Sequence, residues 1–178
     1  MDGLDEKLSR IKAVVFDIDG VLTDGRMIPL ADGDLLRIVD AKDSFAIRAA
    51  GRKGLIVGII SGGKTFALEQ RCLHVGIRPE NIFLGARGKM ALFRFFCEQN
   101  SLAPEEVMYF GDDIPDTQVL RACGVGVVPS DAVEEAKEAA DIISSKPGGK
   151  GCVRAEVERL MKHKGLWVFD PDKFDEIF

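Results

Sequence analysis

Two acidic residues stand close together where an apolar run of the chain ends. Asp17 and Asp19 come directly after Ala13–Phe16, and Gly20 follows them. The apolar run is typical of a strand that is buried on both faces. Carboxylates at the end of such a strand cost free energy unless a metal ion, hydrogen bonds or cations balance their charge. We therefore expect the rest of the chain to supply that balance.

Polar side chains follow two further apolar runs in the same way. Ser61 comes directly after Leu55–Ile60. Asp112 and Asp113 follow Val107–Phe110, with a glycine between. In sheets of parallel strands, ligands bind beyond the carboxyl ends of the strands, so we expect these side chains at one shared edge. Scattered polar residues would have no reason to share such an edge.

The residue types at this edge fit the transfer of a phosphoryl group. Several carboxylates suit a hard cation such as Mg²⁺. The hydroxyl of Ser61, followed by glycines that allow close backbone approach, suits a phosphate oxygen. Lys89 follows a fourth, shorter apolar run and adds a positive charge against the same oxygens. Phosphoryl transfer needs a nucleophile, a metal ion and neutralisation of the equatorial oxygens, and these residue types supply all three.

Strand-like and helix-like segments alternate along the chain, which predicts an α/β fold with a mainly parallel, doubly wound sheet. Residues 26–39 contain two short apolar runs around a turn signal and are expected to form a β-hairpin. We expect a single domain over residues 1–178, with a C-terminal tail from about residue 165 that carries several aromatic residues. The expected strands are Ala13–Phe16, Leu55–Ile60, Ile82–Leu84, Val107–Phe110, Gly126–Val128 and Asp141–Ile143, and the expected helices are Leu4–Arg10, Ser44–Lys53, Lys64–Val75, Lys89–Gln99, Ile114–Ala122, Ala132–Ala139 and Val153–Lys162.

Composition limits the classes of function. The chain has 178 residues, of which 46% are hydrophobic and 30% are charged, as in an ordinary globular domain. The formal charge of −5 disfavours a duplex nucleic acid partner. No apolar run reaches the length of a membrane-spanning helix, and the first residues lack the order of a signal peptide, so we expect a cytoplasmic protein. The four cysteines are widely spaced, which favours buried reduced thiols over a zinc site or disulfides.

Four short motifs carry the polar side chains in a fixed order. They are Asp17-Ile18-Asp19-Gly20-Val21 with Thr23, Ser61 after a strand, Lys89, and Gly111-Asp112-Asp113 with Asp116. This set resembles the motifs of the haloacid dehalogenase superfamily, in its phosphatase branch. Two aspartates separated by one residue are a weak signal alone, but four motifs that follow strands in the expected order are specific.

The resemblance implies separate roles for the two aspartates of the first motif. Asp17 would be the nucleophile that forms an aspartyl-phosphate, which splits the difficult displacement into two steps. Asp19 would protonate the leaving oxygen and then activate the hydrolytic water. Mg²⁺ would be held by the Asp17 carboxylate, the Asp19 backbone carbonyl and Asp112.

The other motif residues are implied to bind the phosphoryl group or to support the residues that do. Ser61, Gly62 and Lys89 would contact the phosphoryl oxygens. Asp113 and Asp116 would shape the surroundings of Lys89 or of the water ligands of the metal. The alternative is that the carboxylates merely cap loops, and it stays open above all for Asp116.

The motifs are too close together for the inserted cap domain that usually closes the site in this superfamily. About 40 residues separate Asp19 from Ser61, and about 28 separate Ser61 from Lys89. The sequences DGVLTDG, GDDIPD and GGKGCVR are similar to those of the capless 3-deoxy-D-manno-octulosonate 8-phosphate phosphatases, over nearly the whole chain. That resemblance implies a homotetramer in which a neighbouring subunit closes the active site, and a role in making a lipopolysaccharide sugar.

The implied substrate is a phosphorylated keto acid, whose carboxylate needs a cation. By position, Arg71 is similar to the substrate arginine of this family, presented by one subunit to the next, although an exposed helix arginine is usually solvated. A sister specificity, for nine-carbon keto-deoxy sugar acid 9-phosphates, tends to have a glutamate where Gly63 stands. A phosphatase of a bulky phosphorylated partner and a non-catalytic oligomerisation module of the same fold stay open as alternatives.

Overall fold

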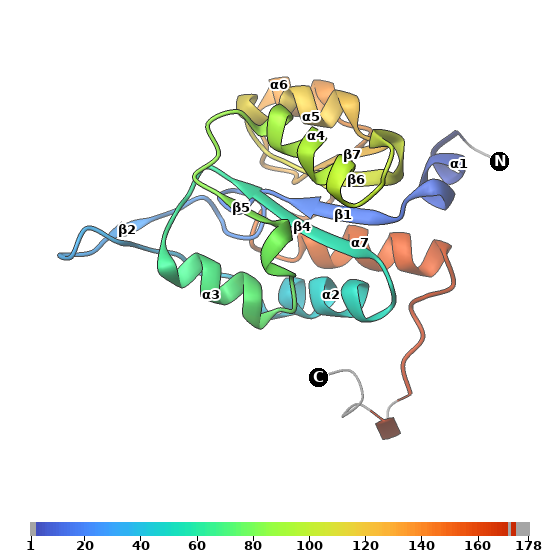
Figure 1. Ribbon diagram of the computed structural model, residues 1–178, viewed down its shortest axis with the longest axis horizontal. Coiled ribbons are helices and arrows are strands. Elements are labelled where there is room, and N and C mark those ends of the chain that lie inside the picture. Colours follow the sequence, from blue (N-terminus) through green and yellow to red (C-terminus); the bar gives the residue numbers. More distant parts are fainter. Residues whose placement is uncertain (1–2, 171, 174–178) are drawn as a thin grey trace.

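The computed structural model describes residues 3–170 and 172–173. At its centre lies a six-stranded sheet with parallel neighbours, in the order β5-β4-β1-β6-β7-β8. Helices cover both faces of this sheet (Figure 1), so the α/β, doubly wound fold expected from the sequence is confirmed. The strands are β1 (Ala13–Phe16), β2 (Ile28–Pro29), β3 (Leu35–Leu36), β4 (Ile56–Ser61), β5 (Ile82–Leu84), β6 (Val107–Phe110), β7 (Val125–Val128) and β8 (Ile142–Ile143).

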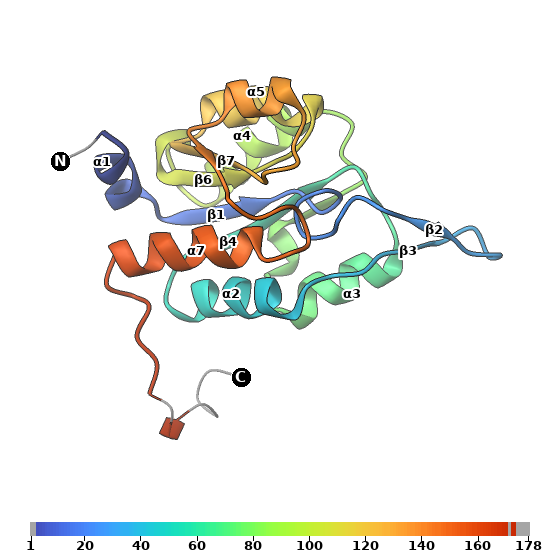
Figure 2. The same cartoon turned by 180° about the vertical axis from the view of Figure 1, so that it is seen from behind.

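Two layers of helices enclose the sheet, and both views show them (Figures 1 and 2). Helices α2, α3 and α7 lie on one face, and α4, α5 and α6 lie on the other. The α-helices are α1 (Gly3–Arg10), α2 (Ala41–Arg52), α3 (Phe66–His74), α4 (Lys89–Gln99), α5 (Thr117–Ala122), α6 (Glu134–Ala139) and α7 (Cys152–His163), and the 3₁₀ helices are η1 (Pro79–Asn81), η2 (Pro104–Glu106) and η3 (Ile114–Asp116). Over the described part of the chain, none of these helices has the length and apolar character needed to span a membrane.

Strand β1 runs through the middle of the sheet and is fully buried. Val14 and Phe16 pack in the core beneath α2 and α7, and the alternate residues pack in the core beneath α4 and α5. This alternation is what a strand covered on both faces produces. β4 and β6 pair with β1 on its two sides, and Phe16 aligns with both Ile59 and Phe110. β1 and β6 therefore end level and β4 extends two residues further, so the residues at these three strand ends share one edge.

Helix α2 begins three residues earlier than the sequence predicts, so the expected start at Ser44 is wrong. Asp40 is the N-cap, and its carboxylate accepts hydrogen bonds from the backbone N–H groups of Lys42 and Asp43. Ser44 lies in the first turn and donates its hydroxyl to the Asp40 carbonyl. The true cap was not distinguishable, because Asp40, Asp43 and Ser44 are all favourable N-cap types.

Three other helices start later than the sequence predicts, and one of them is α6, which begins at Glu134 and not at Ala132. Thr65 caps α3 by accepting from the Leu68 backbone N–H, so this helix begins at Phe66 and not at Lys64. The expected helix over Ile114–Ala122 is divided into η3 and α5. The remaining expected elements agree with the structure to within two residues.

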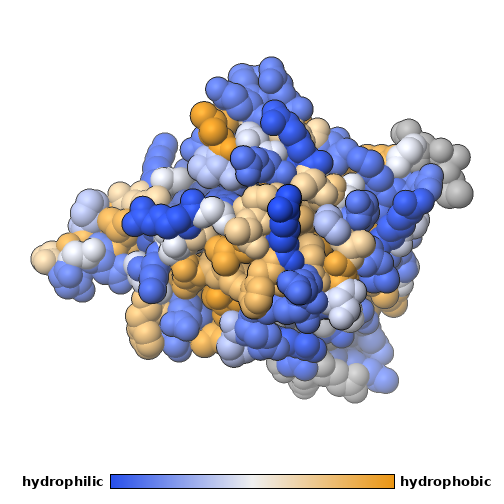
Figure 3. All heavy atoms as spheres, turned by 45° about the horizontal axis from the view of Figure 1, so that its top comes forward, coloured by the Kyte–Doolittle hydropathy of each residue, from blue (hydrophilic) through white to orange (hydrophobic). Residues whose placement is uncertain are grey.

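The hairpin of β2 and β3 projects from the body of the molecule (Figures 1 and 2). It forms a two-stranded sheet of its own, in which Ile28 aligns with Leu36. The hairpin expected over residues 26–39 is therefore present. Figure 3 shows hydrophobic surface on this arm at the left, and the exposed apolar side chains are Met27, Ile28, Leu30, Leu36 and Ile38.

The C-terminal tail packs against its own chain through Trp167 and Phe169. The rings of Trp167 and Phe169 lie 6.1 and 5.6 Å from the Phe45 ring of α2. Both side chains pack against the core beneath α2 and α7. The last two aromatic residues, Phe174 and Phe178, lie outside the described residues.

Candidate active site

The carboxyl ends of β1, β4 and β6 open onto one cleft of about 800 Å³. Residues from four separate segments of the chain line this cleft. The site residues predicted from the sequence that lie here are Asp17, Asp19, Ser61, Gly62, Lys89, Asp112, Asp113 and Asp116. The fold therefore gathers the four motifs into one place, while Arg71 lies elsewhere.

Lys89, the first residue of α4, links two buried carboxylates. Its Nζ donates to Asp17 Oδ2 and to Asp116 Oδ1, each at 2.7 Å, and all three side chains are at most 8% exposed. Tyr109 of β6 donates its hydroxyl to Asp116 Oδ1 at 2.6 Å. Asp116 Oδ2 accepts from two backbone N–H groups of the loop that precedes η3. Both oxygens of Asp116 are therefore engaged, and this residue fixes Lys89 against Asp17.

The electrostatics of the cleft show an excess of negative charge. Burial, followed by the charges of Asp17 and Asp116, raises the pKa of Asp112 to about 8. Burial and the charge of Asp116 raise the pKa of Asp17 to about 6, although Lys89 acts in the opposite direction. Burial acts to lower the pKa of Lys89, but the two neighbouring carboxylates outweigh it and raise that pKa. A bound cation would relieve this imbalance.

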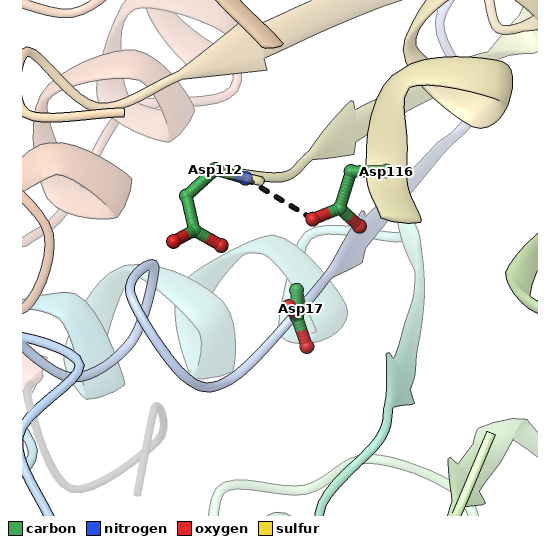
Figure 4. Close-up of side chains that lie close together, drawn as sticks. All are labelled: Asp17, Asp112 and Asp116. Atoms are coloured by element: carbon green, nitrogen blue, oxygen red, sulfur yellow. Dashed lines mark hydrogen bonds between the residues drawn. The ribbon is translucent and has the colours of Figure 1, made fainter. Parts of the chain in front are cut away.

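Three carboxylates converge where such a cation could bind (Figure 4). Asp17, Asp112 and Asp116 each offer an oxygen that lies within 4.8 Å of the others. The Asp116 oxygens accept four hydrogen bonds, whereas each Asp17 oxygen accepts one, so Asp17 and Asp112 are the better ligands. Their carboxylate oxygens and raised pKa values fit a hard divalent cation such as Mg²⁺.

Gly20 allows Asp112 to approach the loop of the first motif. A Cβ at Gly20 would lie 1.9 Å from Asp112 Oδ2, and the backbone there has a φ of +91°. Both features require glycine, since other residues rarely adopt that φ and have no room for their side chain. The glycine of the first motif thus brings the ends of β1 and β6 together.

Ser61 ends β4 and is buried at the edge of the sheet. Its Oγ accepts a hydrogen bond from the Gly63 backbone N–H at 3.3 Å. The loop that follows is tied to the next connection, because Gly85 N–H donates to Gly63 O and Ala86 N–H donates to Ser61 O. The loop of Ser61 and Gly62 is therefore held in place before any ligand binds.

Arg37 is a residue of the site that sequence reasoning missed. Its Nε and Nη2 donate to the two carboxylate oxygens of Asp19 at 2.6 and 3.1 Å. Arg37 follows β3 on the hairpin, so a segment outside the main sheet reaches the first motif. One signal was available: Arg37 is the charged residue within the apolar run Leu35–Val39.

The glycine-rich loop before α7 supports the first motif from outside the cleft. Gly149 N–H donates to Val21 O at 2.9 Å. Gly148 lies so close that a Cβ there would be 1.8 Å from Gly20 O. Asp43 holds the other end of this loop by accepting from the Gly151 backbone N–H at 3.3 Å. The loop therefore has a packing role behind the first motif.

Arg71 does not reach the cleft of its own chain. Its Nη2 donates to the Ser44 Oγ at 2.6 Å, and it lines a small cavity of about 30 Å³ between α2 and α3. Any contact between Arg71 and a substrate would need a second copy of the chain. The structure of one chain does not bring it to the other site residues.

The parallel sheet, the carboxylates after β1 and β6, the hydroxyl of β4 and the buried lysine of α4 define a haloacid dehalogenase-like hydrolase. A family model with that description matches residues 82–155. The chain is 33% identical over 159 residues to the 3-deoxy-D-manno-octulosonate 8-phosphate phosphatase KdsC of Escherichia coli (strain K12), covering 89% of this chain and 84% of that protein. It belongs to the family of 3-deoxy-D-manno-octulosonate 8-phosphate phosphatases.

Solved structures agree with this assignment. The cobalt-bound phosphatase of this family from Haemophilus influenzae is 32% identical, with a TM-score of 0.87 over 94% of this chain and 97% of that chain. The enzyme from Moraxella catarrhalis, in complex with a magnesium ion, a phosphate ion and KDO, is 28% identical, with a TM-score of 0.87 over 92% of each chain.

Proposed function

We propose that this protein is a Mg²⁺-dependent phosphatase that hydrolyses 3-deoxy-D-manno-octulosonate 8-phosphate to the free sugar acid and phosphate. The observation that carries the proposal is Asp17, held against Lys89 at 2.7 Å beside Asp112 in a cleft that gathers all four motifs. The names of the relatives, and the magnesium, phosphate and KDO bound to one of them, support the substrate class.

The reaction proceeds in two steps through Asp17. In the first, an Asp17 oxygen attacks phosphorus, the bond from phosphorus to the sugar oxygen breaks, and Asp19 gives that oxygen its proton. In the second, a water oxygen attacks the aspartyl-phosphate while the Asp19 carboxylate takes a proton from that water. Phosphate leaves, Asp17 regains its carboxylate, and Asp19 carries its proton again.

The residues around Asp17 stabilise the charge of the transferring group. Asp17 Oδ1 accepts a hydrogen bond from the Ile18 backbone N–H at 2.7 Å, and this contact orients the Asp17 carboxylate at the end of β1. The Lys89 ammonium neutralises negative charge on the phosphoryl oxygens. The Ser61 hydroxyl and the backbone at Gly62 bind further phosphoryl oxygens from the loop after β4.

Mg²⁺, when bound by Asp17, Asp112 and the Asp19 backbone carbonyl, supplies further neutralisation of the phosphoryl oxygens. Asp116 supports the reaction by holding Lys89, as its hydrogen bonds indicate. Asp113 is more peripheral, because its carboxylate accepts from the Ile114 backbone N–H at 2.7 Å and caps η3.

The eight-carbon sugar acid is favoured over the nine-carbon one by the relatives and by Gly63, where the sister specificity tends to have glutamate. Arg71 would bind the substrate carboxylate only in the cleft of a neighbouring subunit, since its own cleft lies out of reach. A non-catalytic oligomerisation module is disfavoured because both Asp17 and Asp19 are present. A bulky phosphorylated substrate would suit a chain that stays monomeric.

A homotetramer is part of the proposal, and the hairpin supports it. Five apolar side chains of this arm are exposed, and Ile38 is the most exposed at 69%. Light scattering is expected to give a mass near four times the 19.4 kDa chain. Ile38→Asp is expected to lower that mass, whereas Val168→Asp, at an equally exposed residue of the tail, is expected to leave it unchanged. A monomeric wild-type protein would contradict the tetramer.

The decisive test is phosphate release from the eight-carbon and nine-carbon sugar acid phosphates and from simple phosphomonoesters, with and without Mg²⁺. Asp17→Asn removes the nucleophile and is expected to lower kcat on the order of 10⁴-fold or more. Asp32→Asn, at an exposed turn of the hairpin, is the matched control and is expected to keep full activity. Activity that survives in Asp17→Asn would exclude the mechanism, and equal slow turnover of all substrates would exclude the specific substrate.

A further inference from the structure

The ion pair between Arg37 and Asp19 joins the hairpin to the first motif. The guanidinium contacts both carboxylate oxygens of Asp19, at 2.6 and 3.1 Å, in the two-pronged geometry that fixes a carboxylate plane. Arg37 Nη1 also donates to the Leu35 carbonyl at 3.3 Å, and Nη2 lies 3.6 Å from Met27 Sδ. The guanidinium is thus held by both sides of the hairpin, at Met27 and Leu35, while it holds Asp19.

This ion pair lies directly against the loop that follows β4. A Cβ at Gly63 would be 3.0 Å from Arg37 Nη2 and 3.3 Å from Asp19 Oδ2. A larger side chain at residue 63 would therefore push into the pair. The Arg37 side chain is 5% exposed although it comes from a projecting arm, because it occupies this space beside the loop.

We infer that Arg37 is a positioning residue, which holds the Asp19 carboxylate in the orientation needed for proton transfer and makes that orientation depend on the hairpin. The inference rests on the proposed function, in which Asp19 exchanges a proton with the leaving oxygen and then with water. Proton transfer requires the carboxylate within hydrogen-bond reach of those oxygens. An aspartate with two free side-chain torsions would otherwise sample several orientations.

The pairing leaves Asp19 able to act. Each carboxylate oxygen has a second lone pair, so two hydrogen bonds from Arg37 do not exhaust its capacity to exchange a proton. The hairpin forms its own two-stranded sheet, and an isolated hairpin of this size has little stability of its own. A contact that orders the hairpin therefore also orders Asp19 through Arg37.

The test compares two leaving groups by kcat/KM, which reports the first step alone, because the proton that Asp19 gives in that step is needed only by a poor leaving oxygen. Arg37→Met is expected to lower kcat/KM for an alkyl phosphate such as the sugar acid phosphate about 10- to 100-fold, a part of the usual contribution of a general acid. With 4-nitrophenyl phosphate, whose leaving oxygen needs no proton, we expect a loss of no more than about 3-fold. Arg37→Lys keeps the charge without the two-pronged contact and is expected to recover only part of the activity.

Two further variants separate positioning from folding. In an Asp19→Asn background, Arg37→Met is expected to cause no additional loss, since the residue that it positions is already disabled. Gly63→Val, which crowds the ion pair from the other side, is expected to reproduce the leaving-group pattern of Arg37→Met. Arg121→Met, at an exposed arginine of α5 outside the hairpin and the cleft, is the control and is expected to behave as the wild type.

Equal losses of kcat/KM with both leaving groups, or full additivity with Asp19→Asn, would overturn the positioning role. Melting temperatures of all variants are measured alongside, so that a folding defect is not mistaken for a kinetic one. The proposed function fails separately, if the wild-type protein releases no phosphate or if Asp17→Asn remains active. An active wild type, an inactive Asp17→Asn and an unaffected Arg37→Met would reject only the inference about Arg37.

Discussion

Two ion pairs hold the aspartates of the first motif, and the chain supports them in different ways. The side chains of Lys89 and Asp17 are 7% and 8% exposed. Lys89 also pairs with Asp116, which accepts a hydrogen bond from Tyr109 of β6. Arg37 is as buried, but its partner Asp19 is 21% exposed and Arg37 belongs to the hairpin. The part of the cleft that we propose binds the phosphoryl group is therefore built by the central sheet and α4, whereas the part that we propose transfers the proton is contacted by a projecting arm.

The difference in burial and support indicates how the two ends of the cleft respond to substitutions. Around Lys89, the Tyr109 hydroxyl and backbone amides hold Asp116, and the side chains of Asp17 and Asp116 are 8% and 0% exposed, so water compensates poorly for a lost charge. Around Arg37, water can reach Asp19, because its side chain is 21% exposed. We expect the surroundings of Lys89 to be rigid, so that loss of an ion pair there is costly in free energy. We expect the orientation of Arg37 and Asp19 to depend on what packs against the hairpin.

Loss of Lys89 is expected to have the largest effect. Lys89→Met leaves Asp17 and Asp116 without their shared cation, and an uncompensated buried charge costs about 3–5 kcal/mol. Arg37→Met is expected to cost only about 1–2 kcal/mol, because Asp19 can hydrate. The free energy of unfolding, measured by urea titration in the presence of a chelator, compares the two variants directly.

Lys42→Met is the matched control for this comparison, since Lys42 is exposed in the first turn of α2. We expect it to change the free energy of unfolding by less than about 0.5 kcal/mol. Phosphate release should be abolished in Lys89→Met and retained in the control. Equal losses of stability in Lys89→Met and Arg37→Met would show that the two ends of the cleft are supported alike.

The same contrast explains what the sequence could predict. The apolar runs before Asp17, Ser61 and Asp112 identify three strands, and a parallel sheet necessarily brings their carboxyl ends together. The phosphoryl end of the cleft follows from that pattern alone. The Lys89 contact with Asp116 depends on the exact position of η3 beside α4, which no sequence period encodes.

The hairpin end could be predicted only in part. A turn signal between two apolar runs indicated the hairpin, but the direction in which the arm leaves the sheet was not encoded locally. From the sequence, Arg37 was therefore interpreted only as a charged residue within an apolar run, and its contact with Asp19 was not predicted. Asp40 was missed as the cap of α2 for a related reason, because three favourable cap residues stand within five positions.

The end of the cleft that contains Asp17 and Asp112 should also bind Mg²⁺ in a pH-dependent way. We expect this effect to be smaller than the effects of Lys89→Met and Arg37→Met. In the metal-free protein, the pKa values of Asp112 and Asp17, about 8 and about 6, lie above their ordinary value of 3.8. Groups with a raised folded pKa stabilise the fold fully below about pH 4 and lose that contribution as the pH rises through 6 and 8. Stability without metal should therefore fall over this range, and Mg²⁺ should restore more of it at pH 8 than at pH 6.

Calorimetric titration with Mg²⁺ at pH 6, 7 and 8 measures the linkage. Because the metal must displace protons from these carboxyl groups, its affinity should fall as the pH is lowered, by up to about tenfold per pH unit for each proton displaced. Asp112→Asn should bind Mg²⁺ weakly and with little pH dependence. Asp19→Asn should retain the wild-type profile, because the cluster of Asp17, Asp112 and Asp116 does not include the Asp19 side chain. A changed pH dependence of Mg²⁺ affinity in Asp19→Asn would mean that the Asp19 carboxylate and the three clustered carboxylates interact electrostatically. The two ends of the cleft would then differ in the elements that hold them but would act as one metal-binding site.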